Sequence, residues 1–151
     1  MKSIILTYAP VSDYEKELLQ KTNIFKLALN QHAKEYLPNA RIIADYTLRS
    51  IVSRFGEKII SVRDKSLPES DKIEYFRGKF KGSTIVAAID YLISKQYDEI
   101  LIIGNNQVNN LKFRNEVNVE VSKLKESVKI YQYSDGNFDL PIKSISEFCN
   151  F

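Results

Sequence analysis

The chain has 151 residues and a formal net charge of +3, and 44% of its residues are hydrophobic while 27% are charged. This length fits one domain with its own core, and the composition is ordinary for a globular protein. The small net charge argues against a protein that binds duplex nucleic acid, which needs a concentrated basic surface. The single cysteine, Cys149, excludes an internal disulfide and, beside one histidine, argues against a thiolate-ligated zinc site.

The N-terminal sequence, MKSIILTYAP, carries an apolar run that is shorter than the core of a signal peptide, and no small-residue cleavage site follows it. No stretch of the chain approaches the roughly 20 apolar residues that a membrane span needs. We therefore expect a cytoplasmic protein without a membrane span.

Short apolar runs alternate with amphipathic runs in the first half of the chain. Ser12 and Glu15 form a capping-box pattern that predicts the start of a helix. One or two helical turns are expected before Pro38, and a further helix is expected to begin at Thr47 and to end at Gly56 as a C-terminal glycine. The strands expected in this half share a high apolar content and short length, and they are residues 3–8, 24–30, 40–46 and 58–64.

The second half of the chain continues the alternation. Charged residues within 72–80 predict an edge strand. The helix after Ser83 has a wide apolar stripe, which predicts burial against a sheet. This stripe consists of Ile85, Val86, Ala88, Ile89, Leu92 and Ile93. Residues 99–104 are apolar at four consecutive positions, as in a parallel strand that is covered on both faces. A helix over 110–127, a strand over 128–133 and a short final helix or turn complete the chain.

This order of elements predicts a single three-layer α/β domain with a Rossmann-like, mainly parallel sheet. In such sheets, ligands bind beyond the carboxyl ends of the strands. The candidate ligand-binding residues follow a predicted strand or open a predicted helix, and they are Asn30, Gln31, Asp45, Gly82, Ser83, Thr84, Asn105 and Asn106.

Asn30, Gln31 and His32 come directly after the second predicted strand. Asn30 at this place can hydrogen-bond a nucleotide base, ribose or phosphate, but Asn30 or Gln31 can equally cap the next helix. His32 is the only histidine, and it is a candidate acid or base near neutral pH. A lone histidine on a short surface helix is more often simply solvated, so both interpretations of His32 remain open.

Two further polar groups follow predicted strands. Asp45 can bind a ribose hydroxyl or a metal, or it can pair with Arg49. Asn105 and Asn106 come after the strand at 99–104, where asparagines support turns and also suit a polar ligand.

Gly82, Ser83 and Thr84 open the long helix. Free backbone N–H groups and the helix dipole make such an end suitable for an anion, and Arg77 and Lys81 lie close in sequence. Serine is also a favoured N-cap for reasons unrelated to ligands. The chain contains neither a Walker loop nor a G-x-G-x-x-G motif, so the turn has both interpretations.

The segment 82–106, GSTIVAAIDYLISKQYDEILIIGNN, is a serine-led helix followed by an apolar strand that ends in glycine. It resembles the corresponding segment of the bacterial sialyltransferases of the Campylobacter type, and of the related family named for an archaeal hydroxymethylpterin pyrophosphokinase. KLALNQH (26–32) is similar to the strand that contributes to nucleotide binding in that group, RIIADY (41–46) to the next strand, and residues 128–148 to the C-terminal tail.

The resemblance implies a domain that binds a nucleotide or nucleotide-sugar, with a CMP-sugar favoured. It would place Asn30 at the nucleotide, Ser83 and Thr84 at the phosphate or sugar, and Asp45 and Asn105 at further polar groups. Two departures bear on activity. The glycine-rich first loop of the family is TYAPVSD here, and the catalytic histidine that the sialyltransferases carry beyond the central strand has no counterpart.

Three functions therefore stay open. The first is a glycosyltransferase-related nucleotide-binding domain, and the second is a non-catalytic partner or regulatory domain that kept the fold. The third is magnesium-dependent pyrophosphoryl transfer, for which Asp45 and Asp135 are the carboxylates that the sequence offers. No structural metal is expected. Nine tyrosines and eight phenylalanines are enough to supply a homo-oligomer interface, but a count does not place them.

Overall fold

A computed structural model of the chain describes residues 1–7, 10–44, 55–62, 72–79, 83–104 and 111–149. Within these ranges, seven strands form one sheet, and every neighbouring pair of strands runs parallel. The strands are β1 (Lys2–Leu6), β2 (Phe25–Leu29), β3 (Ala40–Ile43), β4 (Lys58–Ser61), β5 (Ile73–Tyr75), β6 (Glu99–Ile103) and β7 (Lys129–Gln132). The predicted α/β, Rossmann-like fold is confirmed.

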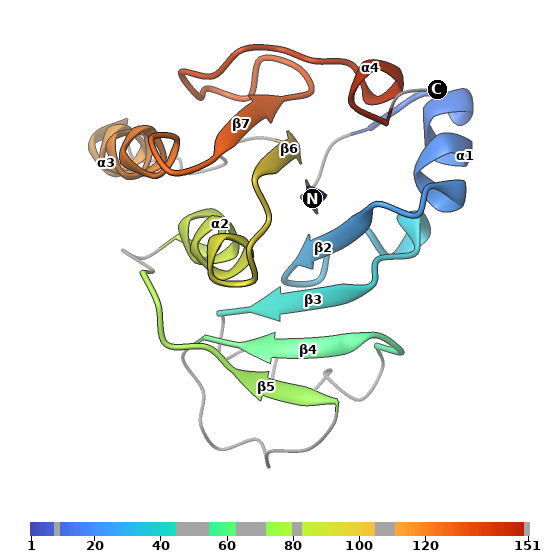
Figure 1. Cartoon of the computed structure of the whole chain (residues 1–151), viewed down its shortest axis with the longest axis horizontal. Coiled ribbons are helices and arrows are strands. Elements are labelled where there is room, and N and C mark those ends of the chain that lie inside the picture. Colours follow the sequence, from blue (N-terminus) through green and yellow to red (C-terminus); the bar gives the residue numbers. More distant parts are fainter. Residues whose placement is uncertain (8–9, 45–54, 63–71, 80–82, 105–110, 150–151) are drawn as a thin grey trace.

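The strand order is β5-β4-β3-β2-β1-β6-β7 (Figure 1). From β1 the chain adds strands on one side as far as β5, and it then returns to place β6 and β7 on the other side. The direction of growth reverses between β1 and β6. This reversal is the topological switch point, beside which open α/β sheets bind their ligands at the carboxyl ends of the strands.

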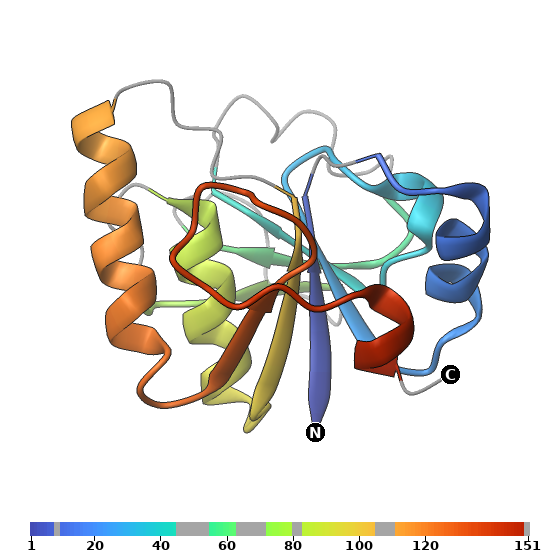
Figure 2. The same cartoon turned by 90° about the horizontal axis from the view of Figure 1, so that it is seen from above.

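Helices cover both faces of the sheet, as Figure 2 shows. One face carries α2 (Thr84–Ser94) and α3 (Leu111–Leu124). The other carries α1 (Asp13–Lys21), α4 (Ile145–Cys149) and the short 3-10 helix η1 (Lys34–Tyr36). Because each crossover helix returns the chain to the start of the next strand, α1 and α2 both begin at the carboxyl edge of the sheet.

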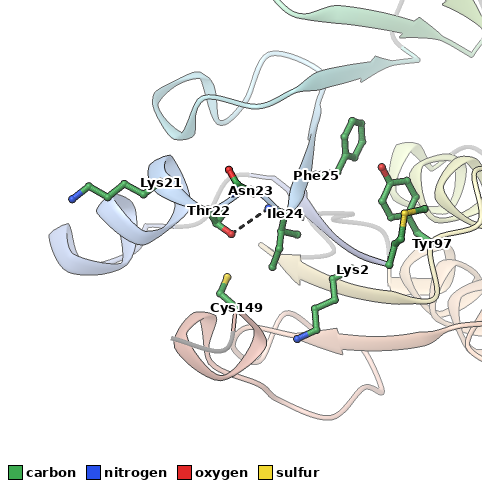
Figure 3. A pocket seen from close by; sticks show the side chains of 9 residues that line it. Lys2, Lys21, Thr22, Asn23, Ile24, Phe25, Tyr97 and Cys149 are labelled. Atoms are coloured by element: carbon green, nitrogen blue, oxygen red, sulfur yellow. Dashed lines mark hydrogen bonds between the residues drawn. The ribbon is translucent and has the colours of Figure 1, made fainter.

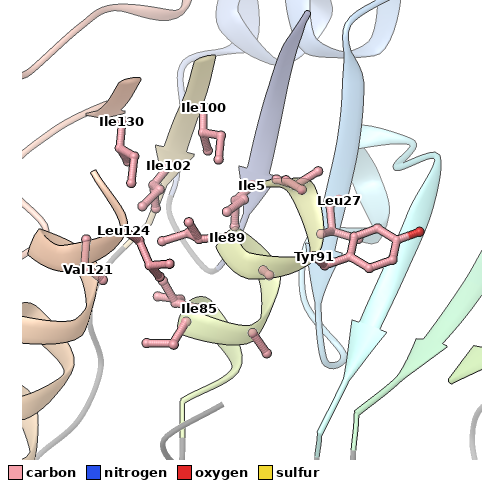
Figure 4. Close-up of a cluster of buried hydrophobic side chains, with 14 of the residues drawn as sticks. Ile5, Leu27, Ile85, Ile89, Tyr91, Ile100, Ile102, Val121, Leu124 and Ile130 are labelled. Carbon is pink, nitrogen blue, oxygen red and sulfur yellow. The ribbon is translucent and has the colours of Figure 1, made fainter. Parts of the chain in front are cut away.

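The α2 helix packs at the centre of the larger core layer (Figure 4). Ile85 and Ile89 of this helix lie in one buried cluster with Ile5 of β1 and Ile102 of β6. Each such side chain contributes about 1.5–3 kcal/mol when it is fully withdrawn from water. The buried positions of α2 are Ile85, Val86, Ala87, Ala88, Ile89, Tyr91 and Leu92. The predicted burial of this helix against the sheet is therefore confirmed.

The β6 strand is covered on both faces, as its unbroken apolar run predicted. Ile100 and Ile102 face the α2 layer, while Leu101 and Ile103 face the layer of α1 and α4. All four side chains have 0% exposure.

Two predictions near the β5 side of the sheet had different outcomes. The edge-strand prediction for 72–80 is confirmed, since β5 is the terminal strand, although it is only three residues long. The helix predicted to end at Gly56 falls on residues 47–54, which lie outside the described residues, so it stays a prediction. Gly56 itself does not have a positive φ. Among the described helices, none has the length and apolar content to cross a membrane.

Candidate functional site

Asn30 follows β2 directly and has a left-handed backbone with a φ of 51°. Asparagine tolerates this conformation better than most residues. Its Nδ2 donates to Oγ1 of Thr84 at 3.3 Å, and its Oδ1 accepts from the backbone N of Ala44 at 3.4 Å. The side-chain amide thus joins the carboxyl ends of β2 and β3 to the start of α2. Both hydrogen bonds are long, so the amide can exchange them for bonds to a ligand at small cost.

The start of α2 presents an uncancelled helix dipole beside this amide. Ser83 is the N-cap, and its Oγ accepts from the backbone N of Val86 at 3.4 Å, so the capping interpretation of Ser83 is confirmed. No acidic residue stands in the first turn of the helix. Because the N-terminal end of a helix dipole is positive, this end of α2 favours negative charge.

The carboxyl ends of β1 and β6 touch at the switch point. The backbone N of Thr7 donates to the carbonyl of Ile103 at 2.9 Å. Gly104 has a φ of 135°, and a Cβ built on it would lie 2.4 Å from Oγ1 of Thr7. Glycine is therefore required at this position, both for its backbone conformation and for the close approach of the two chain segments.

A cavity of about 310 Å³ opens beside Thr7 on the α1 side of the sheet. Its walls include Asp13 and Lys16 from α1, together with Glu35 and Tyr36 from η1. The carboxylates of Asp13 and Glu35 suit the hydroxyl-bearing part of a ligand, because carboxylates accept hydrogen bonds from hydroxyl groups and repel phosphate.

The start of α1 is closed to an anion, in contrast to the start of α2. Oγ of Ser12 accepts from the backbone N of Glu15 at 3.2 Å, and Oε1 of Glu15 accepts from the backbone N of Ser12 at 3.2 Å. The predicted capping box is thus confirmed. Asp13 adds a second carboxylate to this first turn, and Oη of Tyr133 donates to Oε1 of Glu15 at 2.7 Å. Negative charge and filled hydrogen bonds therefore occupy the dipole end of α1.

The turn after β2 rests on a buried cation, Arg41 of β3. Its Nη1 donates to the carbonyl of Asn30 at 2.8 Å and to the carbonyl of His32, while its Nε donates to Oε1 of Glu57 at 2.6 Å. The guanidinium lies over the ring of Phe55, 4.2 Å from the ring centroid. Arg41 was not among the site residues predicted from the sequence. The available signal was a charged residue inside an apolar strand, because a buried charge must be paired.

The other residues predicted after β2 have smaller roles. Gln31 is exposed on the turn. His32 is half-buried, and burial together with the nearby Arg41 guanidinium lowers the pKa of His32 below its ordinary value. The imidazole is therefore neutral at pH 7 and does not provide a cation for a phosphate.

The described residues contain no cluster of three or more His, Cys, Asp or Glu side chains that could hold a metal. Asp135 follows β7, where its Oδ1 accepts from the backbone N of Asn137 at 3.2 Å. The strand before Asp45 is β3, and four strand spacings separate β3 from β7. At about 4.8 Å for each spacing, the ends of these two strands lie roughly 19 Å apart. The sheet therefore does not bring together the two strand ends that the sequence offered for magnesium.

Asp45, Gly82, Asn105 and Asn106 lie outside the described residues, and their predicted roles stay predictions. Of the predicted site residues that are described, the structure brings Asn30 and Thr84 into contact, with Ser83 as the adjacent cap. Gln31 and His32 share the turn that carries Asn30, but they are not part of this contact.

A larger hollow of about 570 Å³ lies at the opposite, amino edge of the strands (Figure 3). Several of its side chains already take part in packing or hydrogen bonds. The rings of Phe25 and Tyr97 stack with centroids 5.4 Å apart, and Nζ of Lys2 donates to the carbonyl of Phe148 at 2.6 Å. Burial raises the pKa of the Cys149 thiol, so this cysteine lacks the thiolate character of a reactive residue. We therefore place the candidate site at the carboxyl edge.

Comparison with known proteins returns no family model, no curated protein and no solved structure that matches this chain. The resemblance to the sialyltransferase and pyrophosphokinase group therefore stays a prediction.

Proposed function

We propose that this chain is a glycosyltransferase-related domain that binds a nucleotide or nucleotide-sugar at the carboxyl edge of its sheet. The observation that carries the proposal is the hydrogen bond between Asn30 and Thr84, which joins residues 54 positions apart in the chain. It sets a side-chain amide and a hydroxyl beside the positive end of α2. Such a group of donors suits a ligand that is both polar and anionic.

The charges along this edge favour a particular orientation of the ligand. The phosphate lies near Ser83 and Thr84, because α2 has no carboxylate in its first turn. The hydroxyl-bearing part points toward the cavity beside Thr7, where Asp13 and Glu35 would repel a phosphate but accept hydrogen bonds from hydroxyls. A nucleotide-sugar has both kinds of group.

The proposal concerns binding, and transfer activity is a separate question. At the described carboxyl edge, the His32 imidazole is neutral at pH 7 and sits on the turn rather than in the Asn30–Thr84 contact. Any transfer would therefore depend on the positioning of substrates and on charge stabilisation. The alternative of a non-catalytic partner domain makes a different prediction, since a chain of that kind has no need to bind a nucleotide.

A thermal unfolding panel tests the proposal with CMP, CDP, UDP, GDP, ATP and CMP-sugars, each with and without magnesium. A ligand at 100 times its Kd stabilises the folded state by about 2.7 kcal/mol. For a domain of this size, that raises Tm by roughly 5–11 °C. Asn30→Ala should abolish the rise. Asn39→Ala is the matched control, because Asn39 lies at the amino edge of the sheet, away from the proposed site. The substitution removes one hydrogen bond, which the backbone N of Lys26 donates to Oδ1 of Asn39 at 2.8 Å.

The outcomes separate the three functions. A rise with CMP or a CMP-sugar that is absent in Asn30→Ala and present in Asn39→Ala supports the proposal. No rise with any nucleotide contradicts it and favours the partner domain. A rise that requires both ATP and magnesium favours pyrophosphoryl transfer instead. A normal rise in Asn30→Ala would show that the binding site is elsewhere.

A further inference from the structure

Arg41 is a fully buried cation in the interior of the sheet. It pairs in register with Ala28 of β2 on one side and with Ile59 of β4 on the other, and its exposure is 0%. Its guanidinium is held by Glu57 at Nε and by the Phe55 ring beneath it. With the alkyl chain also buried, the planar group has no freedom to change its position.

The immobile guanidinium acts on one turn. Its Nη1 donates to the carbonyls of Asn30 and His32, which begin and end the three-residue turn after β2. The backbone N of Asn30 meanwhile donates to the carbonyl of Ile42 at 2.9 Å. Both peptide groups of Asn30 are therefore anchored to β3, and they fix the left-handed backbone from which the side chain reaches Thr84.

Stability alone does not account for this arrangement. Nη2 of Arg41 is buried and has no hydrogen-bond partner among the described residues, and an unpaired buried donor is unfavourable. A buried ion pair is often no more stable than apolar side chains of similar size. The benefit of Arg41 therefore lies in the turn that it organises.

We infer that Arg41 and Glu57 are positioning residues for Asn30 and that they set the affinity of the site for its ligand. This inference rests on the proposed function, in which the Asn30 amide binds the nucleotide. The Arg41 guanidinium donates to the carbonyls of the turn, and Glu57 holds this guanidinium in position. A lysine cannot replace the arginine, because one ammonium group lacks the planar fork that reaches Glu57 and both carbonyls.

The first test uses the protein without ligand, so it does not depend on the identity of the nucleotide. In ¹H–¹⁵N correlation spectra, Arg41→Lys should move the side-chain NH₂ signals of Asn30 and the backbone amide signal of Ala44. Glu57→Gln should move the same signals in the same direction by a smaller amount, since it keeps the shape but removes the charge. The Val86 amide, which Ser83 caps, should stay in place in both variants.

Lys26→Met is the matched control. Lys26 is also a buried cation, with 3% exposure, and its Nζ donates to a backbone carbonyl, that of Leu19, at 2.6 Å. It stands at the amino half of β2, away from the turn. This variant should leave the Asn30 and Ala44 signals unchanged.

The second test is a calorimetric titration with CMP. Arg41→Lys should raise Kd about tenfold, the effect expected when one polar contact to a ligand is lost, while Lys26→Met should leave Kd unchanged. Unmoved Asn30 signals in both Arg41→Lys and Glu57→Gln would overturn the inference, and so would an unchanged Kd in variants whose signals moved. If the unmutated protein does not bind CMP, the proposed ligand is wrong, and the ligand-free spectra still decide whether Arg41 positions Asn30. Should Arg41→Lys not fold, Glu57→Gln provides both readouts.

Discussion

Replacing Gly104 by alanine should weaken the seam between β1 and β6 at the switch point. The φ of 135° is unfavourable for any residue with a Cβ, and the new Cβ would lie 2.4 Å from Oγ1 and 2.6 Å from Cγ2 of Thr7. Backbone strain of this kind costs about 1–3 kcal/mol, and overpacking costs about 1–3 kcal/mol more. The free energy of unfolding of Gly104→Ala should therefore fall by roughly 2–6 kcal/mol.

Urea unfolding monitored by circular dichroism measures this loss. Gly56→Ala is the matched control, because a Cβ at Gly56 meets nothing within 4 Å and the backbone there is not left-handed. That variant should be neutral or up to about 1 kcal/mol more stable, since alanine restricts the unfolded chain. A loss of stability that comes from replacing any glycine would appear in both variants. The loss from backbone strain and overpacking should appear only in Gly104→Ala.

A double variant separates the two causes of the loss. Thr7→Ala removes Oγ1 and Cγ2 but keeps Cβ, which lies 2.9 Å from the new side chain. In the Thr7→Ala background, Gly104→Ala should therefore be less damaging by about 1–3 kcal/mol, while the backbone strain remains. A Gly104→Ala variant whose free energy of unfolding stays within about 0.5 kcal/mol of the unmutated protein would show that neither the strain nor the overpacking exists, because surface substitutions scatter by that amount.

Three further predictions concern stability. Gln132→Ala should lower the free energy of urea unfolding by about 2–4 kcal/mol, because two carbonyls and one N–H lose the hydrogen bonds that the buried Gln132 amide now makes to them. A loss below about 1 kcal/mol would contradict a stabilising role of these three hydrogen bonds. Burial raises the pKa of Glu15, but hydrogen bonds from Tyr133 and Ser12 outweigh it and hold that pKa below its ordinary value. The resulting stability is present above the unfolded pKa of about 4.3 and is lost as pH falls through the folded pKa, so Tyr133→Phe should cost about 1 kcal/mol at pH 7 and progressively less as the pH falls below about 4.3. A cost that does not fall with pH would exclude that linkage. Ser12→Ala should lower Tm more than Ser83→Ala, because the α1 cap is reciprocal while the α2 cap is one 3.4 Å bond; the reverse order would contradict this.

The fold was predictable where a pattern reports burial directly. The apolar stripe of α2 and the unbroken apolar run of β6 each indicate which faces of the element are buried. This burial can be predicted from the spacing of apolar residues in a single segment of the sequence. A glycine is a weaker signal than these patterns, because the residue type permits a left-handed backbone without requiring it. Gly104 has a positive φ, whereas Gly56 does not.

The site was predictable only in part. Asn30 follows from the rule that polar residues after parallel strands meet at one edge, and Thr84 follows from the helix that starts there. Arg41 was missed because its role depends on partners from other segments, with Glu57 sixteen residues later and a turn on the neighbouring strand. The contact of Thr7 with Gly104 likewise exists only because β1 and β6 are neighbours in the sheet, an order that local patterns do not contain.

The helices α1 and α2 both begin at the carboxyl edge of the sheet but differ in the charge of their first turns. The first turn of α1 carries Asp13 and Glu15, whereas that of α2 carries no acidic residue. Glu15 is held there by Ser12 from its own cap and by Tyr133 from beyond β7. An anion at this end of α1 would have to displace a hydrogen-bonded carboxylate and face a second one. The first turns of α2 and α3 carry no carboxylate and so favour negative charge, and of these two helices α2 is the one that Asn30 contacts.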